Sequence, residues 1–137
     1  MVTETLPALE RLRRDILEAS VTLSPMEVRY LVDDYYAMQD RRKTDRNQER
    51  ALKAADEPHQ IMDWLASQST LLERELKRVL DTWSSAHPVG VWAKSIVGIG
   101  PIIAAGLLAH IDIEQAPTCG HIWRFAGLDP TSKWNKG

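Results

Sequence analysis

The sequence has only one cysteine, Cys119, in 137 residues. A single thiol cannot form a disulfide within the chain, which excludes a small disulfide-stapled secreted fold and fits a reducing compartment. Apolar runs are also short, and none reaches the roughly 20 residues that a membrane-spanning helix needs. The first residues, Met1-Val2-Thr3-Glu4, lack the basic start of a signal peptide. We therefore expect a cytoplasmic protein without a membrane partner.

An excess of positive charge is missing as well. The chain has 17 Lys and Arg against 19 Asp and Glu, a formal net charge of −2. Residues 1–57 contain ten basic and twelve acidic side chains, and residues 58–137 contain seven of each. Strong non-specific binding of nucleic acid depends on many Lys and Arg that release counterions. Any nucleic-acid contact must therefore come from local clusters and backbone amides, or be shared with another chain.

Strand patterns, internal repeats and low-complexity runs are not found, and the remaining pattern is helical. Apolar residues between Leu6 and Ala19 have the spacing of one helix face. Ser24-Pro25-Met26-Glu27 is a helix start, with serine as N-cap, proline first and glutamate third. The helix that follows is predicted to run from Pro25 into the low fifties, where Asp56-Glu57-Pro58 ends it. A second, strongly amphipathic helix comes next. Its apolar face consists of Ile61, Leu65, Leu72, Leu76, Val79, Leu80 and Trp83.

These patterns predict an all-α fold, with a long antiparallel αα-hairpin followed by a small helix-hairpin-helix module. We expect a helical arm at residues 1–86 and the module at residues 87–137. The polar stretch 39–50 must project into solvent or against a partner, and the apolar faces exceed what two helices bury in each other. A homodimer through the hairpin is therefore expected. The first long helix should direct inward Val28, Leu31, Val32, Tyr35 and Met38.

The module contains a short glycine turn, Gly98-Ile99-Gly100-Pro101, between two apolar segments. Both glycines can take φ > 0 without a Cβ clash, and Pro101 suits the first position of a new helix. Free amides and the positive end of the helix dipole then point at one spot, which favours an anion such as a backbone phosphate. We expect short helices near residues 91–96 and at 101–110, and a last one at 118–125 with Thr118 as N-cap.

This turn and its neighbours are the candidate nucleic-acid contacts. Lys94 precedes the turn, and Trp134 is a candidate for base stacking. The positions after Pro101 are isoleucines, where a strong phosphate-binding hairpin would usually carry Lys or Arg, so a purely structural turn is the alternative interpretation. The full set of candidates is Lys94, Val97, Gly98, Ile99, Gly100, Ile102, Lys133 and Trp134.

The same region carries an ordered pair of motifs. They are Gly98-Ile99-Gly100-Pro101 with Ala104-Ala105-Gly106-Leu107-Leu108-Ala109 and Ile111-Asp112, and then Phe125-Ala126-Gly127-Leu128-Asp129-Pro130. In order and spacing they resemble the C-terminal domain of a family of bacterial insertion-sequence transposases, also known as bridge-RNA-guided recombinases. The resemblance covers about residues 90–137. It implies a domain that packs against DNA and RNA, with a nucleophilic serine just before a glycine that follows the second motif.

The resemblance does not extend to that serine. The matching glycine would be Gly137, the residue before it is Lys136, and Ser132 is out of register. The family's nuclease-like domain, with strands and metal-binding acids, has no counterpart in this sequence. His110, Cys119 and His121 lack the fourth ligand of a structural zinc site, so a buried thiol beside a hydrogen-bonded histidine is expected instead. No catalytic residue, metal or cofactor is predicted.

The basic residues of the first long helix and the tryptophans also have purely structural interpretations. Basic residues on the first long helix either form a nucleic-acid stripe or pair with interleaved acids of the same helix. The stripe would consist of Arg41, Arg42, Lys43, Arg46, Arg50 and Lys53. Among the tryptophans, Trp92 and Trp123 are expected to pack around the terminal module.

Three functions fit these features. The motif pair favours a nucleic-acid-binding module related to mobile-element transposases and recombinases, which grips the phosphate backbone through the Gly98–Gly100 turn without chemistry of its own. DNA is favoured over RNA. The balanced charge favours the alternative of a helical dimerisation or interaction protein with a structural hairpin. A third possibility is a fragment of a transposase whose active site needs residues beyond Gly137.

Overall fold

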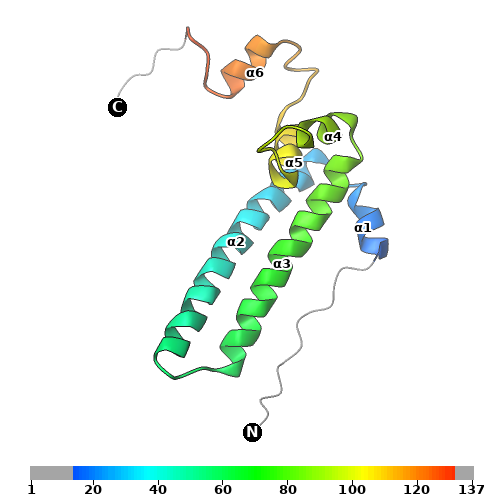
Figure 1. The fold of residues 1–137 in the computed structure, drawn as a ribbon. Helices are drawn as coiled ribbons and strands as arrows, with labels where there is room; N and C mark the ends of the chain where they lie inside the picture. The colour runs from blue at the N-terminus through cyan, green and yellow to red at the C-terminus, as the bar shows by residue number, and fades with distance from the viewer. Residues whose placement is uncertain (1–13, 132–137) are drawn as a thin grey trace.

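The computed structural model describes residues 14–131, which form six helices and no strand. The predicted all-α fold is confirmed. Two long antiparallel helices dominate the described part, and three short helices lie beyond one end of this hairpin (Figure 1). None of the helices in residues 14–131 is both long and apolar enough to cross a membrane.

The long hairpin consists of α2 (Pro25–Ala54) and α3 (Gln60–Ser85), preceded by the short α1 (Arg14–Ser20). The predicted start of α2 is confirmed in detail. Glu27 N donates to Ser24 Oγ at 3.2 Å and Ser24 N donates to the Glu27 carboxylate at 2.7 Å, which satisfies two amides that a helix start leaves free. Between the two helices, Asp56 adopts a φ of 57° in the connecting turn.

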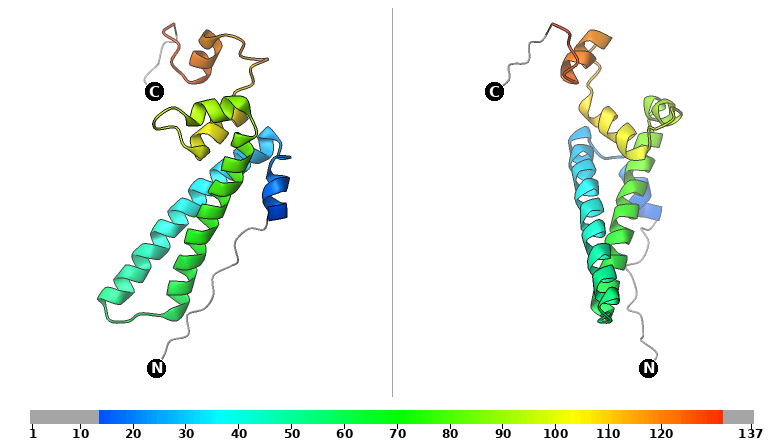
Figure 2. Two further views of the ribbon diagram at one scale, coloured as in Figure 1. Left: turned by 45° about the vertical axis from the view of Figure 1, so that its right-hand side comes forward. Right: turned by 60° about the vertical axis from the view of Figure 1, so that its left-hand side comes forward.

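Three shorter helices follow: α4 (Pro88–Lys94), α5 (Pro101–His110) and α6 (Cys119–Phe125). Both α4 and α5 pack on the base of the hairpin, and α5 contacts α2 as well as α3. Gly90 permits the close approach of α4, because a Cβ there would lie 2.1 Å from the Ser84 carbonyl oxygen. In contrast, α6 stands apart and packs against no other helix of residues 14–131 (Figure 2).

The hydrophobic core lies at the base, where α2, α3 and α5 meet. Trp83 is 3% exposed there, and its indole Nε1 donates to the Leu23 carbonyl at 3.0 Å, which fixes the chain entering α2. The core thus contains residues from both sides of position 86, and the division of the chain into two domains stays a prediction. The buried members of the core are Val28, Val32, Tyr35, Leu80, Trp83, Ile102, Ala105 and Ala109.

The outer half of the hairpin is held by polar contacts between α2 and α3. Asp45 is only 4% exposed; its carboxylate accepts from Ser69 Oγ and lies 3.1 Å from Arg41 Nε. At the next residue of each helix, Arg46 donates to Thr70 Oγ1 at 3.1 Å. The sequence predicts that residues 39–50 project into solvent or against a partner. One face of this stretch is exposed, but the other lies along α3, where interhelical hydrogen bonds replace the missing apolar contacts.

Candidate nucleic-acid interface

The glycine turn connects the end of α4, at Lys94, to the start of α5, at Pro101. The predicted helix at 101–110 is confirmed as α5, with Gly100 as its N-cap. The preceding helix lies earlier than the expected 91–96, because Pro88 occupies its first turn and it ends at Lys94. Within the turn, Ile99 N donates to the Ile96 carbonyl at 3.1 Å. The connection is therefore a tight, hydrogen-bonded turn.

Only one of the two turn glycines requires a glycine conformation. Gly98 has a φ of 92°, which side chains rarely adopt. Gly100 has φ −91° and ψ −177°, extended backbone open to any residue, and a Cβ placed there would meet nothing within 4 Å. Of the two glycines expected to allow positive φ, only Gly98 uses it, and a side chain at Gly100 would not distort the turn. This makes Gly100 the position where a substitution changes access to the turn without straining it.

The start of α5 presents backbone donors at the surface. The amides of Gly100, Ile102 and Ile103 make no backbone hydrogen bond within residues 14–131, as expected for a first helical turn. Val97 at the tip is fully exposed. Ile102, a predicted contact, has its side chain in the core, so only its backbone amide faces the turn. Oriented amides and a helix N-terminus favour an anion at this point.

Lys94 has a different position from the one the sequence suggested. Its ammonium lies 2.8 Å from Asp81 Oδ1, also contacts Ser85 Oγ, and its side chain is 18% exposed. This ion pair ties α4 to the end of α3. A phosphate contact by Lys94 would thus compete with Asp81. Lys133 and Trp134 lie outside the described residues.

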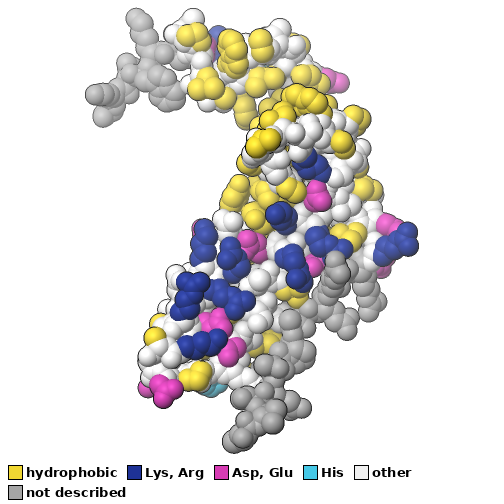
Figure 3. All heavy atoms as spheres, in the orientation of Figure 1, with side chains coloured by type: hydrophobic (Ala, Val, Ile, Leu, Met, Phe, Trp, Pro, Cys, Tyr) yellow, Lys and Arg dark blue, Asp and Glu magenta, His cyan; other side chains and the backbone are white. Residues whose placement is uncertain are grey.

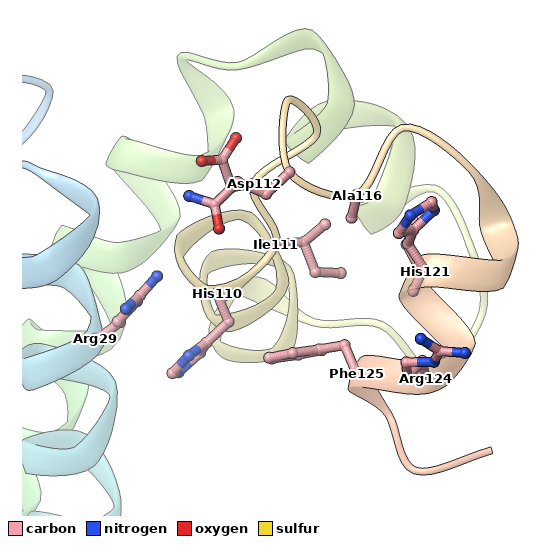
Figure 4. Close-up of a pocket in the computed structure, with 10 residues that line it drawn as sticks. Arg29, His110, Ile111, Asp112, Ala116, His121, Arg124 and Phe125 are labelled. Atoms are coloured by element: carbon pink, nitrogen blue, oxygen red, sulfur yellow. The ribbon is translucent and has the colours of Figure 1, made fainter. Parts of the chain in front are cut away.

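A pocket of about 550 Å³ lies at the opposite end of α5 from the turn. Arg29 of α2 and His110 line one side, His121 and Arg124 of α6 line the other, and apolar side chains lie between them (Figure 4). Arg29 Nε donates to the Ala109 carbonyl at 2.7 Å. Nothing in the sequence pointed to Arg29, because no local pattern connects it with a residue 80 positions later.

Side chains of α6 differ from expectation. Cys119 is exposed rather than buried, while His121 Nδ1 does lie within hydrogen-bond distance of a hydroxyl, 2.6 Å from Thr118 Oγ1. No group of three or more His, Cys, Asp or Glu side chains in residues 14–131 is arranged to hold a metal ion.

Trp92 is 64% and Trp123 53% exposed, so the expectation that both pack around the module is wrong.

The basic residues of α2 pair with acids. Arg46 and Lys53 both bind Glu49, at 2.8 and 2.7 Å, and these hydrogen bonds lower the pKa of the Glu49 carboxyl. Arg42 instead pairs with Glu73 of α3. The interpretation of the stripe as ion pairs therefore accounts for most of these side chains.

Comparison with known proteins links the C-terminal region to a transposase family. The model of the transposase IS116/IS110/IS902 family matches residues 92–134, the C-terminal region of the chain. The match begins within α4 and includes the glycine turn, α5 and α6. It confirms the resemblance that the two motifs indicated, and it links this region to mobile-element transposases. No curated protein and no solved structure matches the chain.

Proposed function

We propose that the region after residue 87 is a nucleic-acid-binding module related to mobile-element transposases, which binds the phosphate backbone through the α4–α5 turn and has no chemistry of its own. The observation that carries this proposal is the position of the turn. An exposed, glycine-dependent turn with unbonded amides falls inside the segment that matches the transposase family.

Binding to a phosphate would depend on the backbone amides at the start of α5 and on few charged side chains. A phosphate at the start of α5 can accept from the amides of Gly100, Ile102 and Ile103, next to the positive end of the helix dipole. Such contacts position a backbone without reading its bases. Since Lys94 is paired with Asp81, the contact relies on backbone donors more than on cations, and its salt dependence should be shallow.

A salt-dependent titration tests this function. Duplex, single-stranded and branched DNA, and matched RNA, are titrated with the full chain at several salt concentrations. We expect measurable binding with a slope of log K against log salt of about −1 to −3, since few phosphates are neutralised. Absence of binding to every one of these nucleic acids at low salt would overturn the proposal.

The alternative, a helical interaction protein, is favoured by one specific observation. Apolar side chains of the terminal helices gather on the surface, whereas charged side chains dominate the hairpin face in the same view (Figure 3). Trp92, Val97 and Phe125 are 64%, 100% and 65% exposed, an arrangement that marks many protein-binding surfaces. If the titration shows no nucleic-acid binding, this function takes precedence.

A further inference from the structure

The pocket between α5 and α6 has a composition that the glycine turn does not explain. Two arginines, two histidines and one aspartate line it, together with Gln115 and apolar side chains. Its lining side chains therefore carry one net positive charge when both imidazoles are neutral and three when both are protonated. Asp129, the ion-pair partner of Arg124 just outside the lining, lowers each figure by one. From these features we propose that the pocket binds a phosphate ester that has a flat apolar part, such as a nucleotide, and binds it more tightly as the histidines become protonated.

The polar groups stand at two sides of the pocket. Arg29 and His110 lie on the side of α2 and α5, and His121 and Arg124 lie on α6 (Figure 4). Each arginine uses its Nε for a structural bond, Arg29 to the Ala109 carbonyl and Arg124 to Asp129 at 3.1 Å. A guanidinium has five N–H donors, so both keep donors for a ligand while their stems are held in place.

The floor of the pocket suits the organic part of such a ligand. Ile111 and Phe125 extend into the space between α5 and α6 (Figure 4), and Phe125 is 65% exposed. An aromatic ring can stack on a planar base. The volume of about 550 Å³ lies in the range of about 300–1,000 Å³ that small-ligand sites occupy.

The histidines make the site sensitive to pH. Histidine is the side chain whose charge ordinarily changes between pH 5 and 8. With the ring of His121 bonded through Nδ1 to Thr118, protonation leaves its Nε2–H as a donor for an anion. The charged or titratable groups that line the pocket around it are Arg29 of α2, His110 and Asp112 at the end of α5, and Arg124 of α6. Asp112 is the single acid of this set, and its Oδ1 already accepts from Glu114 N at 3.0 Å. A second acid, Asp129, lines the adjoining hollow together with His121 and is paired with Arg124.

Calorimetric titration of the full chain tests the proposal. Thymidine 5′-monophosphate, thymidine and inorganic phosphate are titrated at pH 8. The methyl ester of the monophosphate, a diester that keeps one negative charge at both pH values whereas a monoester loses charge near pH 6, is titrated at pH 6 and pH 8. We expect the monophosphate to bind at least about fivefold more tightly than either fragment, and its methyl ester about fivefold more tightly at pH 6 than at pH 8, the scale of one net hydrogen bond. Equal affinity of the monophosphate and thymidine, or equal affinity of the methyl ester at the two pH values, would overturn the proposal.

Variants localise the binding. His121→Gln, in the exposed helix α6, is expected to raise Kd about fivefold at pH 6 and to reduce the pH dependence. Arg29→Gln is expected to weaken binding about tenfold, whereas Arg50→Gln, with the same charge change about 30 Å along α2, leaves Kd unchanged. Since Arg29 also bonds Ala109, its variant is checked by melting temperature, and His121→Gln decides the matter if that variant unfolds. Unchanged binding in both pocket variants would refute the site.

Two sources can supply this ligand. A 5′-phosphorylated oligothymidylate that binds more tightly than its 5′-hydroxyl counterpart identifies a strand end, and binding of the free monophosphate alone identifies a nucleotide. Gly100→Ala, at the other end of α5, should leave monophosphate binding unchanged. The pocket and the turn are therefore tested independently.

Discussion

At the scale of single residues, the turn separates two glycines that the sequence presents as a pair. Gly98 is held at positive φ, so an alanine there is expected to cost about 1–2 kcal/mol in strain. Gly100 has extended backbone and open space where a Cβ would lie. A substitution at Gly98 therefore tests the stability of the fold, whereas one at Gly100 tests the access of a ligand to the amides of the turn.

Replacing Gly100 with alanine is expected to keep the fold and weaken nucleic-acid binding. The added methyl leaves the turn unstrained but stands where a phosphate would approach the amides. Losing one charge-assisted contact should cost about 1–3 kcal/mol of binding, or roughly 5- to 150-fold in Kd. Circular dichroism and melting check the fold, and fluorescence anisotropy measures binding.

The matched control is Gly106→Ala in the same helix. A Cβ at Gly106 meets only Val32 Cγ1 at 3.9 Å, and alanine raises helix propensity by about 1 kcal/mol, so this variant should melt higher and bind nucleic acid unchanged. If the folded Gly100→Ala protein binds like the parent, the turn is structural.

The ion pair between Lys94 and Asp81 gives a second test at this scale. If Lys94 contacts a phosphate, Asp81→Asn frees the ammonium and should tighten binding severalfold, while Lys94→Ala should reduce the salt slope by about one. A purely structural pair predicts the opposite pattern: both variants lower the melting temperature slightly and neither changes the salt slope. Binding titrations at three salt concentrations distinguish the two outcomes.

At the scale of elements, the hairpin uses different forces along its length. Its base is apolar and its outer half polar, with the buried Asp45 bonded to Ser69 and close to Arg41. Asp45→Ala is expected to destabilise the protein by about 1–3 kcal/mol, because it removes the buried carboxylate's hydrogen bond to Ser69 of α3 and its ion pair with Arg41. Urea unfolding measures the effect.

Asp40→Ala is the matched control for that substitution. Asp40 is exposed on the same helix and pairs with Lys43 at 3.4 Å, a surface pair that contributes at most about 0.5 kcal/mol. Equal destabilisation by the two variants would contradict the role of the buried carboxylate.

Glu49 should make the outer half of the hairpin sensitive to acid. Hydrogen bonds from Lys53 and Arg46 lower the pKa of its carboxyl in the folded protein. Its contribution to stability is therefore complete above the ordinary glutamate pKa of about 4.3, and it is lost as the pH falls through the lowered folded value. We expect Glu49→Gln to reduce the melting temperature at pH 7 and to have less effect at pH 3; an equal effect at both would contradict this.

At the scale of the whole molecule, association through the hairpin remains a prediction. Ile61 and Leu72 of α3 are 51% and 41% exposed, which supports an apolar surface available to a second copy. Sedimentation equilibrium at tens of micromolar should show a dimer, as for a dissociation constant on the order of 1–10 μM. Only monomer in that range would contradict the prediction.

Whether a feature of this structure could be predicted from the sequence depends on how far apart in the chain its contacting residues lie. Local signals were sufficient for the capping box at Ser24–Glu27 and for α5 with its Pro101 start, because a few adjacent residues determine such ends. Contacts across the fold were not accessible, since Asp45 and Ser69, or Arg29 and Ala109, meet only once the helices are in register. The same limit explains Trp92: an aromatic side chain suggests burial, yet its helix face determines whether a neighbour covers it.

The isolation of α6 has a consequence for what the C-terminal region can signal. No other helix of residues 14–131 packs against α6, so few contacts there offset the conformational entropy of holding α6 beside α5. A ligand that touches both sides of the intervening pocket would supply that free energy and settle α6 in one orientation. Occupancy of a small site would then be read out as a fixed orientation of α6 relative to α5.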